Sequence, residues 1–212
     1  MEPRVLEQSI PVEEFYEIRT YLETHNLGVN KYRVKVGEGV SQCFGIVGKR
    51  CMPPDLSRQS WLHPQLHHLL VEFGKKYLPP GFTYTSIQVN VDFPCKLHKD
   101  IGNIGDSCIF LFGPFIGGAL EIEGRDYFFH QRGLLFDGSQ MEHQTKPWVG
   151  HRFALVYHTL APLTRWHNQI PSIDDYEALV IDGHWKIRRK SDGELFWSVK
   201  GLPHPLRGRK KI

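Results

Sequence analysis

The chain has few cysteines and no long apolar stretch, and each shortage argues against a class of protein. Its four cysteines among 212 residues form no C-x-x-C pair, which argues against a disulfide framework and against a structural zinc site. No apolar run approaches the roughly eighteen residues that cross a bilayer, so we expect no membrane partner. The N-terminus, MEPRVLEQSIPVEEF, lacks the basic and apolar regions of a secretory signal. We therefore expect an intracellular protein.

Charge is divided unevenly along the chain, although the formal net charge is only +3. Residues 186–211 hold nine lysines and arginines against two acidic residues, a local charge of +7, so the preceding part carries −4. A basic terminus on a mildly acidic body suits a polyanion, and nucleic acid is the predicted partner. A solvated tail, or a signal for import into the nucleus, explains the same residues equally well. The candidate nucleic-acid contacts are Arg207, Arg209, Lys210 and Lys211.

Two amphipathic segments precede a region of short strands. Residues 11–25 and 61–77 place apolar side chains at helical spacing, so we predict a helix in each. His67 and His68 lie on the second helix, and we expect both at the surface because adjacent residues diverge around a helix. Residues 52–60, MPPDLSRQS, are predicted to form a loop.

The character of the sequence changes near residue 84. Residues 84–92, YTSIQVNVD, alternate between apolar and polar side chains, as in a strand with one polar face. Further short strands follow, separated by turns that contain glycine. This pattern indicates a sandwich or barrel, and an eight-stranded double-stranded β-helix, the cupin-like jelly roll, accommodates the strands of residues 83–160. The predicted fold class is mostly β with flanking helices (α+β).

Length and composition predict a single domain over residues 1–212. A content of 41% hydrophobic and 12% aromatic residues is typical of one globular core. We assign residues 1–82 to N-terminal helices and strands that support the core, and residues 161–212 to a basic C-terminal extension. In that extension, HWKIRRKSDGELFWSVKG is predicted to form a hairpin that turns at its SDG triplet. Nothing in the sequence points to an obligate protein partner.

The most informative motif is His98-Lys99-Asp100, which is followed much later by His143. Two imidazoles and one carboxylate on one face of an octahedral ion leave positions open for a co-substrate and dioxygen, as in non-haem Fe(II) oxygenases. Residues two apart on a strand point to the same side, so we expect His98 and Asp100 to reach inward while Lys99 points away. An isolated H-x-D triplet also arises by chance in a chain with twelve histidines. A zinc hydrolase uses similar ligands.

Arg152, nine residues after His143, strengthens the metal hypothesis. A guanidinium pairs with a carboxylate through two parallel hydrogen bonds, and a zinc hydrolase has no evident need for it. The diacid 2-oxoglutarate fits both features, because its keto-acid end can chelate iron while its far carboxylate meets Arg152. Gln88 and Asn90, on the polar face of the predicted strand, and Tyr84 are candidate co-substrate contacts. Polar groups satisfied inside a barrel explain these three residues equally well.

The segments LHKDIGNIGDSCIFLFGPFIGGALEIEG and FDGSQMEHQTKPWVGHRFALVYHT resemble the catalytic core of Fe(II)/2-oxoglutarate-dependent dioxygenases. The resemblance spans residues 83–160 and is closest to the TET/JBP branch, which oxidises methyl groups on DNA pyrimidines. The branch resemblance depends on HKDIGN, where Asn103 stands three residues after Asp100, and on the segment GGALEI. The chain differs from the branch in lacking a large Cys-rich region, in having Arg152 closer to the distal histidine, and in having Ala154 where many relatives have Ser.

This resemblance implies Fe(II) held by His98, Asp100 and His143, with 2-oxoglutarate and O2 as co-substrates and Arg152 as the carboxylate anchor. It implies hydroxylation of a C–H bond. The expected target is the methyl group of 5-methylcytosine or thymine in nucleic acid, with DNA favoured, and Asn103 is expected to hydrogen-bond the target base. The alternative is a prolyl or other peptidyl side-chain hydroxylase, or a small-molecule hydroxylase, of the same superfamily. A binding module without a metal is a third hypothesis, and the presence of all three ligands and the arginine argues against it.

Overall fold

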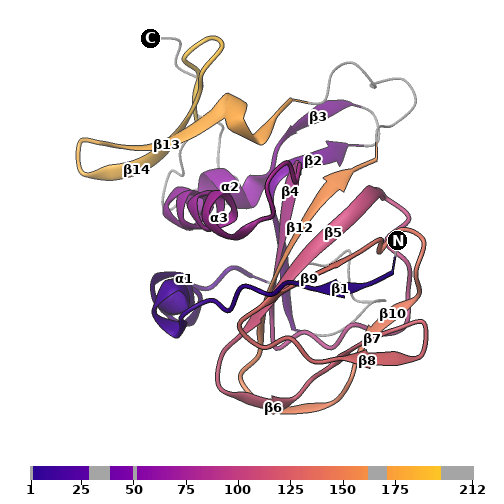
Figure 1. The fold of residues 1–212 in the computed structure, drawn as a ribbon. Coiled ribbons are helices and arrows are strands. Elements are labelled where there is room, and N and C mark those ends of the chain that lie inside the picture. Colours follow the sequence, from indigo (N-terminus) through magenta and orange to yellow (C-terminus); the bar gives the residue numbers. More distant parts are fainter. Residues whose placement is uncertain (1, 29–38, 50–51, 162–170, 197–212) are drawn as a thin grey trace.

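The computed structural model of the chain describes residues 2–28, 39–49, 52–161 and 171–196. Seven antiparallel strands form one sheet, the major sheet, through the centre of the molecule (Figure 1). In order across the sheet they are β1 (Arg4–Val5), β9 (Gly133–Phe136), β5 (Asn103–Phe112), β12 (Phe153–Leu160), β4 (Ser86–Val91), β2 (Val40–Lys49) and β3 (Met52–Leu56). The chain leaves this sheet after β5 and again after β9 to build a second, smaller layer.

Short strands of the second layer face one side of the major sheet. They are β6 (Phe115–Gly117), β7 (Leu120–Ile122), β8 (Arg125–Tyr127), β10 (His143–Thr145) and β11 (Trp148–Gly150), paired in the orders β10-β7-β8 and β11-β6. Leu120 and Ile122 from this layer pack in one buried cluster with Ile109, Leu111 and Ala154 of the major sheet. Two antiparallel layers joined by these crossings form a jelly roll, so the predicted fold class is confirmed.

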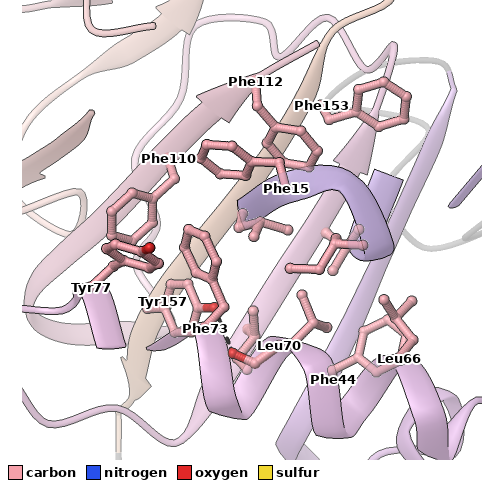
Figure 2. Packing of buried hydrophobic residues seen from close by; sticks show 14 of the residues in the cluster. Phe15, Phe44, Leu66, Leu70, Phe73, Tyr77, Phe110, Phe112, Phe153 and Tyr157 are labelled. Carbon is pink, nitrogen blue, oxygen red and sulfur yellow. Dashed lines mark hydrogen bonds between the residues drawn. The ribbon is translucent and has the colours of Figure 1, made fainter. Parts of the chain in front are cut away.

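Helices cover the opposite face of the major sheet. They are η1 (Val12–Phe15), α1 (Tyr16–Thr24), α2 (Arg58–Leu62) and α3 (Pro64–Tyr77). Figure 2 shows the aromatic contacts on this face: the ring of Phe15 stacks on Phe112 with centroids 4.5 Å apart, and Phe73 meets Phe110 edge to face at 5.2 Å. Because side chains alternate along a strand, this face packs under the helices, while the other face packs on the second layer and also lines a cavity. No helix among the described residues has both the length and the apolar character needed to cross a bilayer.

The helix predicted over residues 61–77 is broken near its start. α2 ends at Leu62, and α3 begins at Pro64, because a proline disfavours helical backbone in the residue before it. His63 accordingly has φ −128° and ψ 60°. The expectation that His67 lies at the surface is wrong, since its side chain is only 2% exposed. Burial lowers the pKa of His67 to about 3, so its imidazole is neutral in the folded protein.

The region predicted as a loop over residues 52–60 instead contains strand β3 and most of α2. Two prolines, Pro53 and Pro54, suggested a loop, but β3 is an edge strand, where a residue without an N–H group is tolerated. The hydroxyl of Ser57 then caps α2 by accepting a hydrogen bond from the backbone N–H of Ser60, at 3.1 Å.

A small three-stranded sheet packs beside α2 and α3 (Figure 1). Its members are β13 (Tyr176–Ile181), β14 (His184–Arg189) and β15 (Leu195–Phe196), preceded by the 3-10 helix η3 (Ile173–Asp175). β14 and β15 form the hairpin predicted at the SDG triplet. The ring of Trp185 lies 5.1 Å from that of His68, so His68 is half-buried between α3 and β14. At least this part of the C-terminal extension therefore contributes to the packed structure.

Candidate metal and co-substrate site

Three side chains expected to bind a metal converge at one point. Their donor atoms all lie within 4.8 Å of one another. Asp100 places one carboxylate oxygen 3.5 Å from Nε2 of His98 and the other 3.7 Å from Nε2 of His143. With metal–ligand bonds of about 2.1 Å, neighbouring donors around an octahedral ion lie about 3 Å apart, so only a small adjustment is needed for one ion to reach all three.

Backbone carbonyl groups fix which nitrogen of each imidazole faces this point. Nδ1 of His98 lies 2.7 Å from the carbonyl of Lys96, and Nδ1 of His143 lies 3.0 Å from the carbonyl of Met141. A carbonyl oxygen only accepts, so each Nδ1 must carry the proton and donate it. The Nε2 lone pairs are then directed toward Asp100, which is the arrangement that a metal-ligating histidine adopts.

The H-x-D motif lies in a loop that is held from both sides, and not on the strand that we expected. His98 and His143 form an isolated antiparallel bridge with two backbone hydrogen bonds of 3.1 and 3.0 Å. The N–H of Asp100 donates to the carbonyl of Gly138 at 2.8 Å. Lys99 is exposed, whereas His98 and Asp100 on either side of it are half-buried, and Lys99 also borders the cavity that His98 and Asp100 line. Tertiary hydrogen bonds, and not strand alternation, therefore aim the two ligands.

Arg152 directly precedes β12 and is buried, with only 3% of its surface exposed. Its Nε donates to the carbonyl of Gly118 at 3.2 Å, whereas its Nη2 has no hydrogen-bond partner among the residues that the structure describes. Its guanidinium lies over the rings of Trp148 and Phe115, and burial lowers the pKa of Arg152 to about 10. A buried cation with an unused donor is costly unless an anion pairs with it. The site therefore fits a carboxylate ligand.

Asp92 holds the backbone of Arg152, a role that the sequence did not reveal. Its carboxylate accepts from the N–H of Arg152 at 2.8 Å, and its own N–H donates to the carbonyl of Arg152 at 2.9 Å. The other carboxylate oxygen lies 3.0 Å from Nδ1 of His151. Asp92 has φ +47°, in the left-handed region where Asp is among the better tolerated residues. Nothing in the sequence indicates that Asp92 adopts this φ, so its contact with Arg152 could not be predicted.

The three candidate metal ligands and Arg152 line one cavity of about 370 Å³. Strand β12 runs along the cavity, and Arg152 stands just before its first residue. Asn103 also lines the cavity and pairs with Leu160, the last residue of β12, so Arg152 and Asn103 mark opposite ends. His158, which is 9% exposed, faces the cavity near the Asn103 end and was missed. Counting alternate residues from Arg152 along β12 would have found it.

Gln88 and Asn90 both line the cavity, as expected from strand alternation. A third residue, Ser41 on β2, connects them. The Ser41 hydroxyl donates to Oδ1 of Asn90 at 2.6 Å and accepts from Nε2 of Gln88 at 2.9 Å. Ser41 is fully buried and gave no signal in the sequence, because only the pairing of β2 with β4 brings it there.

Tyr84 is placed differently from our expectation. It precedes β4, and its ring packs edge to face on Tyr157 at 5.1 Å, on the helix-covered side of the major sheet. Tyr84 does not line the cavity, and burial raises its pKa above the ordinary value, so the tyrosine is a core residue and not a co-substrate contact. The strand starts two residues after Tyr84, so the alternation that places Gln88 and Asn90 does not extend back to it. The four predicted nucleic-acid contacts, Arg207, Arg209, Lys210 and Lys211, lie outside the described residues.

No protein-family model and no curated protein sequence matches the chain. Among solved structures, NgTET1 in complex with 5mC DNA aligns over 75% of this chain and 72% of its own, with a TM-score of 0.56 and 20% identity. A 2OG-Fe(II) oxygenase family oxidoreductase from Burkholderia pseudomallei covers 74% of this chain and 82% of its own (TM-score 0.47, 16% identity). A prolyl-4-hydroxylase from Pseudomonas putida covers 76% and 93% (TM-score 0.44, 13% identity). The chain thus shares the fold of NgTET1, which confirms the predicted resemblance at the level of fold.

Proposed function

We propose that this protein is an Fe(II)- and 2-oxoglutarate-dependent dioxygenase that hydroxylates the methyl group of a modified pyrimidine in nucleic acid. One observation carries the proposal: three side chains that could hold a metal line the same cavity as a buried guanidinium whose Nη2 has no hydrogen-bond partner among the described residues. His98, Asp100 and His143 would hold the iron, and Arg152 would hold the far carboxylate of 2-oxoglutarate. Two imidazoles and one carboxylate are the donor set of oxygen-activating iron sites, and they leave coordination positions open.

When bound, iron, 2-oxoglutarate and dioxygen supply the oxidising chemistry that converts a C–H bond to an alcohol, with succinate and carbon dioxide as co-products. The protein's own residues orient and enclose the reactants. Carbonyl groups hold the imidazoles in one tautomer, and Arg152, itself held by the carbonyl of Gly118, would fix the direction of the diacid. Ile109, Leu120 and Phe136 form an apolar wall, which limits the access of water to the reacting atoms.

The substrate assignment depends on the Asn103 end of the cavity. Asn103 offers an amide donor and acceptor there, a pair suited to the edge of a base. His158 lies near the same end. The shared fold with NgTET1, whose solved structure contains 5mC DNA, supports nucleic acid as the substrate class. The proposal includes contacts between the basic C-terminal residues and the phosphates of the nucleic acid.

The proposal is tested by measuring two products at once. Purified protein is incubated with Fe(II), 2-oxoglutarate and DNA that contains 5-methylcytosine, and succinate and oxidised nucleosides are quantified by mass spectrometry. We expect both products from the wild type and neither from Asp100→Ala, because two imidazoles alone hold iron weakly. Asp126→Ala, at an exposed position on β8, is the matched control and should retain both. Full succinate release by Asp100→Ala would show that the metal site is misassigned.

Arg152→Gln separates the co-substrate site from the metal site. A charge-assisted hydrogen bond contributes about 1.5–3 kcal/mol, so the KM for 2-oxoglutarate should rise by about tenfold to a hundredfold while iron affinity is retained. Arg188→Gln, on the exposed side of β14, is the control for loss of a positive charge. An unchanged KM in Arg152→Gln would show that a residue other than Arg152 binds the far carboxylate of 2-oxoglutarate. Succinate release coupled to a peptide and to no nucleic acid would keep the enzyme class and overturn the substrate.

A further inference from the structure

A tight turn with an exposed apolar tip follows the metal ligand Asp100. We call residues 100–103 the rim turn. The N–H of Asn103 donates to the carbonyl of Asp100 at 2.9 Å, which leaves Ile101 and Gly102 as the two central residues. The side chain of Ile101 is 86% exposed, the largest exposure among the large hydrophobic residues that the structure describes. Ile101 and Asn103 also line the cavity, so the tip stands at its mouth.

The backbone of the rim turn is held on both sides of Ile101. The N–H of Asp100 donates to the carbonyl of Gly138 at 2.8 Å, and the carbonyl of Gly102 accepts from the N–H of Ala161 at 2.8 Å. These bonds tie the turn to the segment between β9 and β10 and to the residue after β12. Ile101 is therefore an aliphatic side chain presented to solvent from a fixed support, and not the tip of a loose loop.

The surroundings of the rim turn combine apolar and basic side chains. Leu97 and Ile104, on either side of the turn, are 54% and 52% exposed. Lys96 and Lys99 are exposed in the same loop, and neither forms an ion pair with another described residue. A surface that offers aliphatic groups and unpaired lysines at the entrance of a cavity fits a partner that is apolar in its interior and anionic along its backbone. A nucleic-acid duplex has both properties.

A base that is stacked in a duplex cannot reach a metal at the bottom of a cavity, so an enzyme must extrude it. The gap left in the stack is flat and apolar, and aliphatic side chains fill such gaps in other DNA-bending proteins. We propose that Ile101 enters the base stack of a duplex and occupies the space of the extruded target nucleotide, while Lys96 and Lys99 contact the adjacent phosphates. This inference rests on the proposed nucleic-acid substrate. Because Ile101 directly follows the metal ligand Asp100, the gap left by the extruded nucleotide would lie next to the iron.

The test compares duplex with single-stranded DNA, because only the duplex has a gap to fill. In Ile101→Ser we expect the rate of methyl oxidation in a duplex to fall by about tenfold or more, since unstacking a step costs a few kcal/mol that the wedge no longer offsets. The rate on a single strand should stay within about twofold of wild type. Ile101→Leu should restore the duplex rate. Ile116→Ser is the matched control, because Ile116 is 84% exposed on β6, away from the cavity, and should leave both rates unchanged.

A second readout does not require turnover. With Mn(II) in place of Fe(II), the wild type and Ile101→Leu should increase the fluorescence of 2-aminopurine placed beside 5-methylcytosine in a duplex, and Ile101→Ser should not. Equal losses on duplex and single strand, or an unchanged fluorescence response in Ile101→Ser, would overturn the wedge. Failure of the proposed function looks different: the wild type would then release succinate without oxidising either form of DNA. A peptide substrate would appear as succinate release that depends on the peptide and not on DNA.

Discussion

The hydrogen bonds of Ser41 determine which amide atoms of Asn90 and Gln88 remain available in the cavity. Ser41 donates to Oδ1 of Asn90 and accepts from Nε2 of Gln88. A hydroxyl has one proton, so the two bonds fix each other's direction. Nδ2 of Asn90 is then the group left to donate into the cavity, and Oε1 of Gln88 is the group left to accept. Because Asn90 pairs with Ala154, close to Arg152, its donor is the one suited to a carboxylate oxygen of the proposed co-substrate.

We predict that Ser41→Ala weakens 2-oxoglutarate binding without weakening metal binding. The two amides lose a shared partner and the free energy of unfolding should fall by about 1–3 kcal/mol, the usual effect of leaving buried polar atoms unsatisfied. The KM for 2-oxoglutarate should rise severalfold, with the Mn(II) affinity unchanged. Ser107→Ala is the control, since Ser107 is 1% exposed and its hydroxyl has no hydrogen-bond partner in the part of the chain that the structure describes. Equal effects of the two substitutions on KM would show that Ser41 is merely a packing residue.

Several helices and strands were predictable from local patterns, one local signal at Pro64 was overlooked, and the path of the H-x-D loop was not predictable because tertiary contacts determine it. The apolar spacing of residues 11–25 gave η1 and α1, and the alternation before the metal ligands gave β4. The break before Pro64 has a local cause, the restriction that a proline places on the preceding residue. The H-x-D loop has no local cause, because backbone bonds to His143 and Gly138 define its path. The residue types that bind a metal could be recognised in sequence, while the element that carries them could not.

Helix α3 contains His67, a buried histidine that should make the folded state less stable at low pH and that sequence analysis wrongly placed at the surface. Burial, with a smaller effect of His68, lowers the pKa of His67 to about 3, whereas an unfolded chain has a histidine pKa of about 6.5. Between these values the unfolded state binds more protons than the folded state. The contribution of His67 to stability is therefore complete above pH 6.5 and is lost as the pH falls toward 3, by about 1.4 kcal/mol per pH unit.

We predict that His67→Leu flattens the dependence of the unfolding free energy on pH between 6.5 and about 4. The measurement is urea unfolding at a series of pH values, with the slope and not the absolute stability compared between proteins. His184→Leu is the control, because His184 is exposed at the start of β14 and its imidazole meets water in both states. Parallel wild-type and His67→Leu profiles would contradict the prediction.

The complete site exists only in the folded jelly roll, which brings together segments that are distant in sequence. The candidate metal ligands come from the loop before β5 and from β10 of the smaller layer, while Arg152 precedes β12 of the major sheet. Sequence motifs pointed to His98, Asp100 and His143 as candidate metal ligands, because the chemistry of a metal limits the residue types that bind it, and the fold brings these three side chains together. Ser41 and Asp92 could not be predicted in the same way, since their roles depend on the pairing of β2 with β4 and on a left-handed backbone conformation, whereas strand alternation from Arg152 would have indicated His158.

Ligands that join these segments should stabilise the whole fold in two separable steps. At a concentration of about 100 times its Kd, a ligand that binds only the folded state adds about 2.7 kcal/mol, roughly 5–10 °C in Tm for a domain of this size. We expect Mn(II) alone to raise Tm, and 2-oxoglutarate added under anaerobic conditions to raise it further. Asp100→Ala should lose both increments, because the diacid needs the metal. Arg152→Gln should keep the increment from Mn(II) and lose most of the increment from 2-oxoglutarate. A full 2-oxoglutarate increment in that variant would show that the guanidinium of Arg152 does not bind the co-substrate.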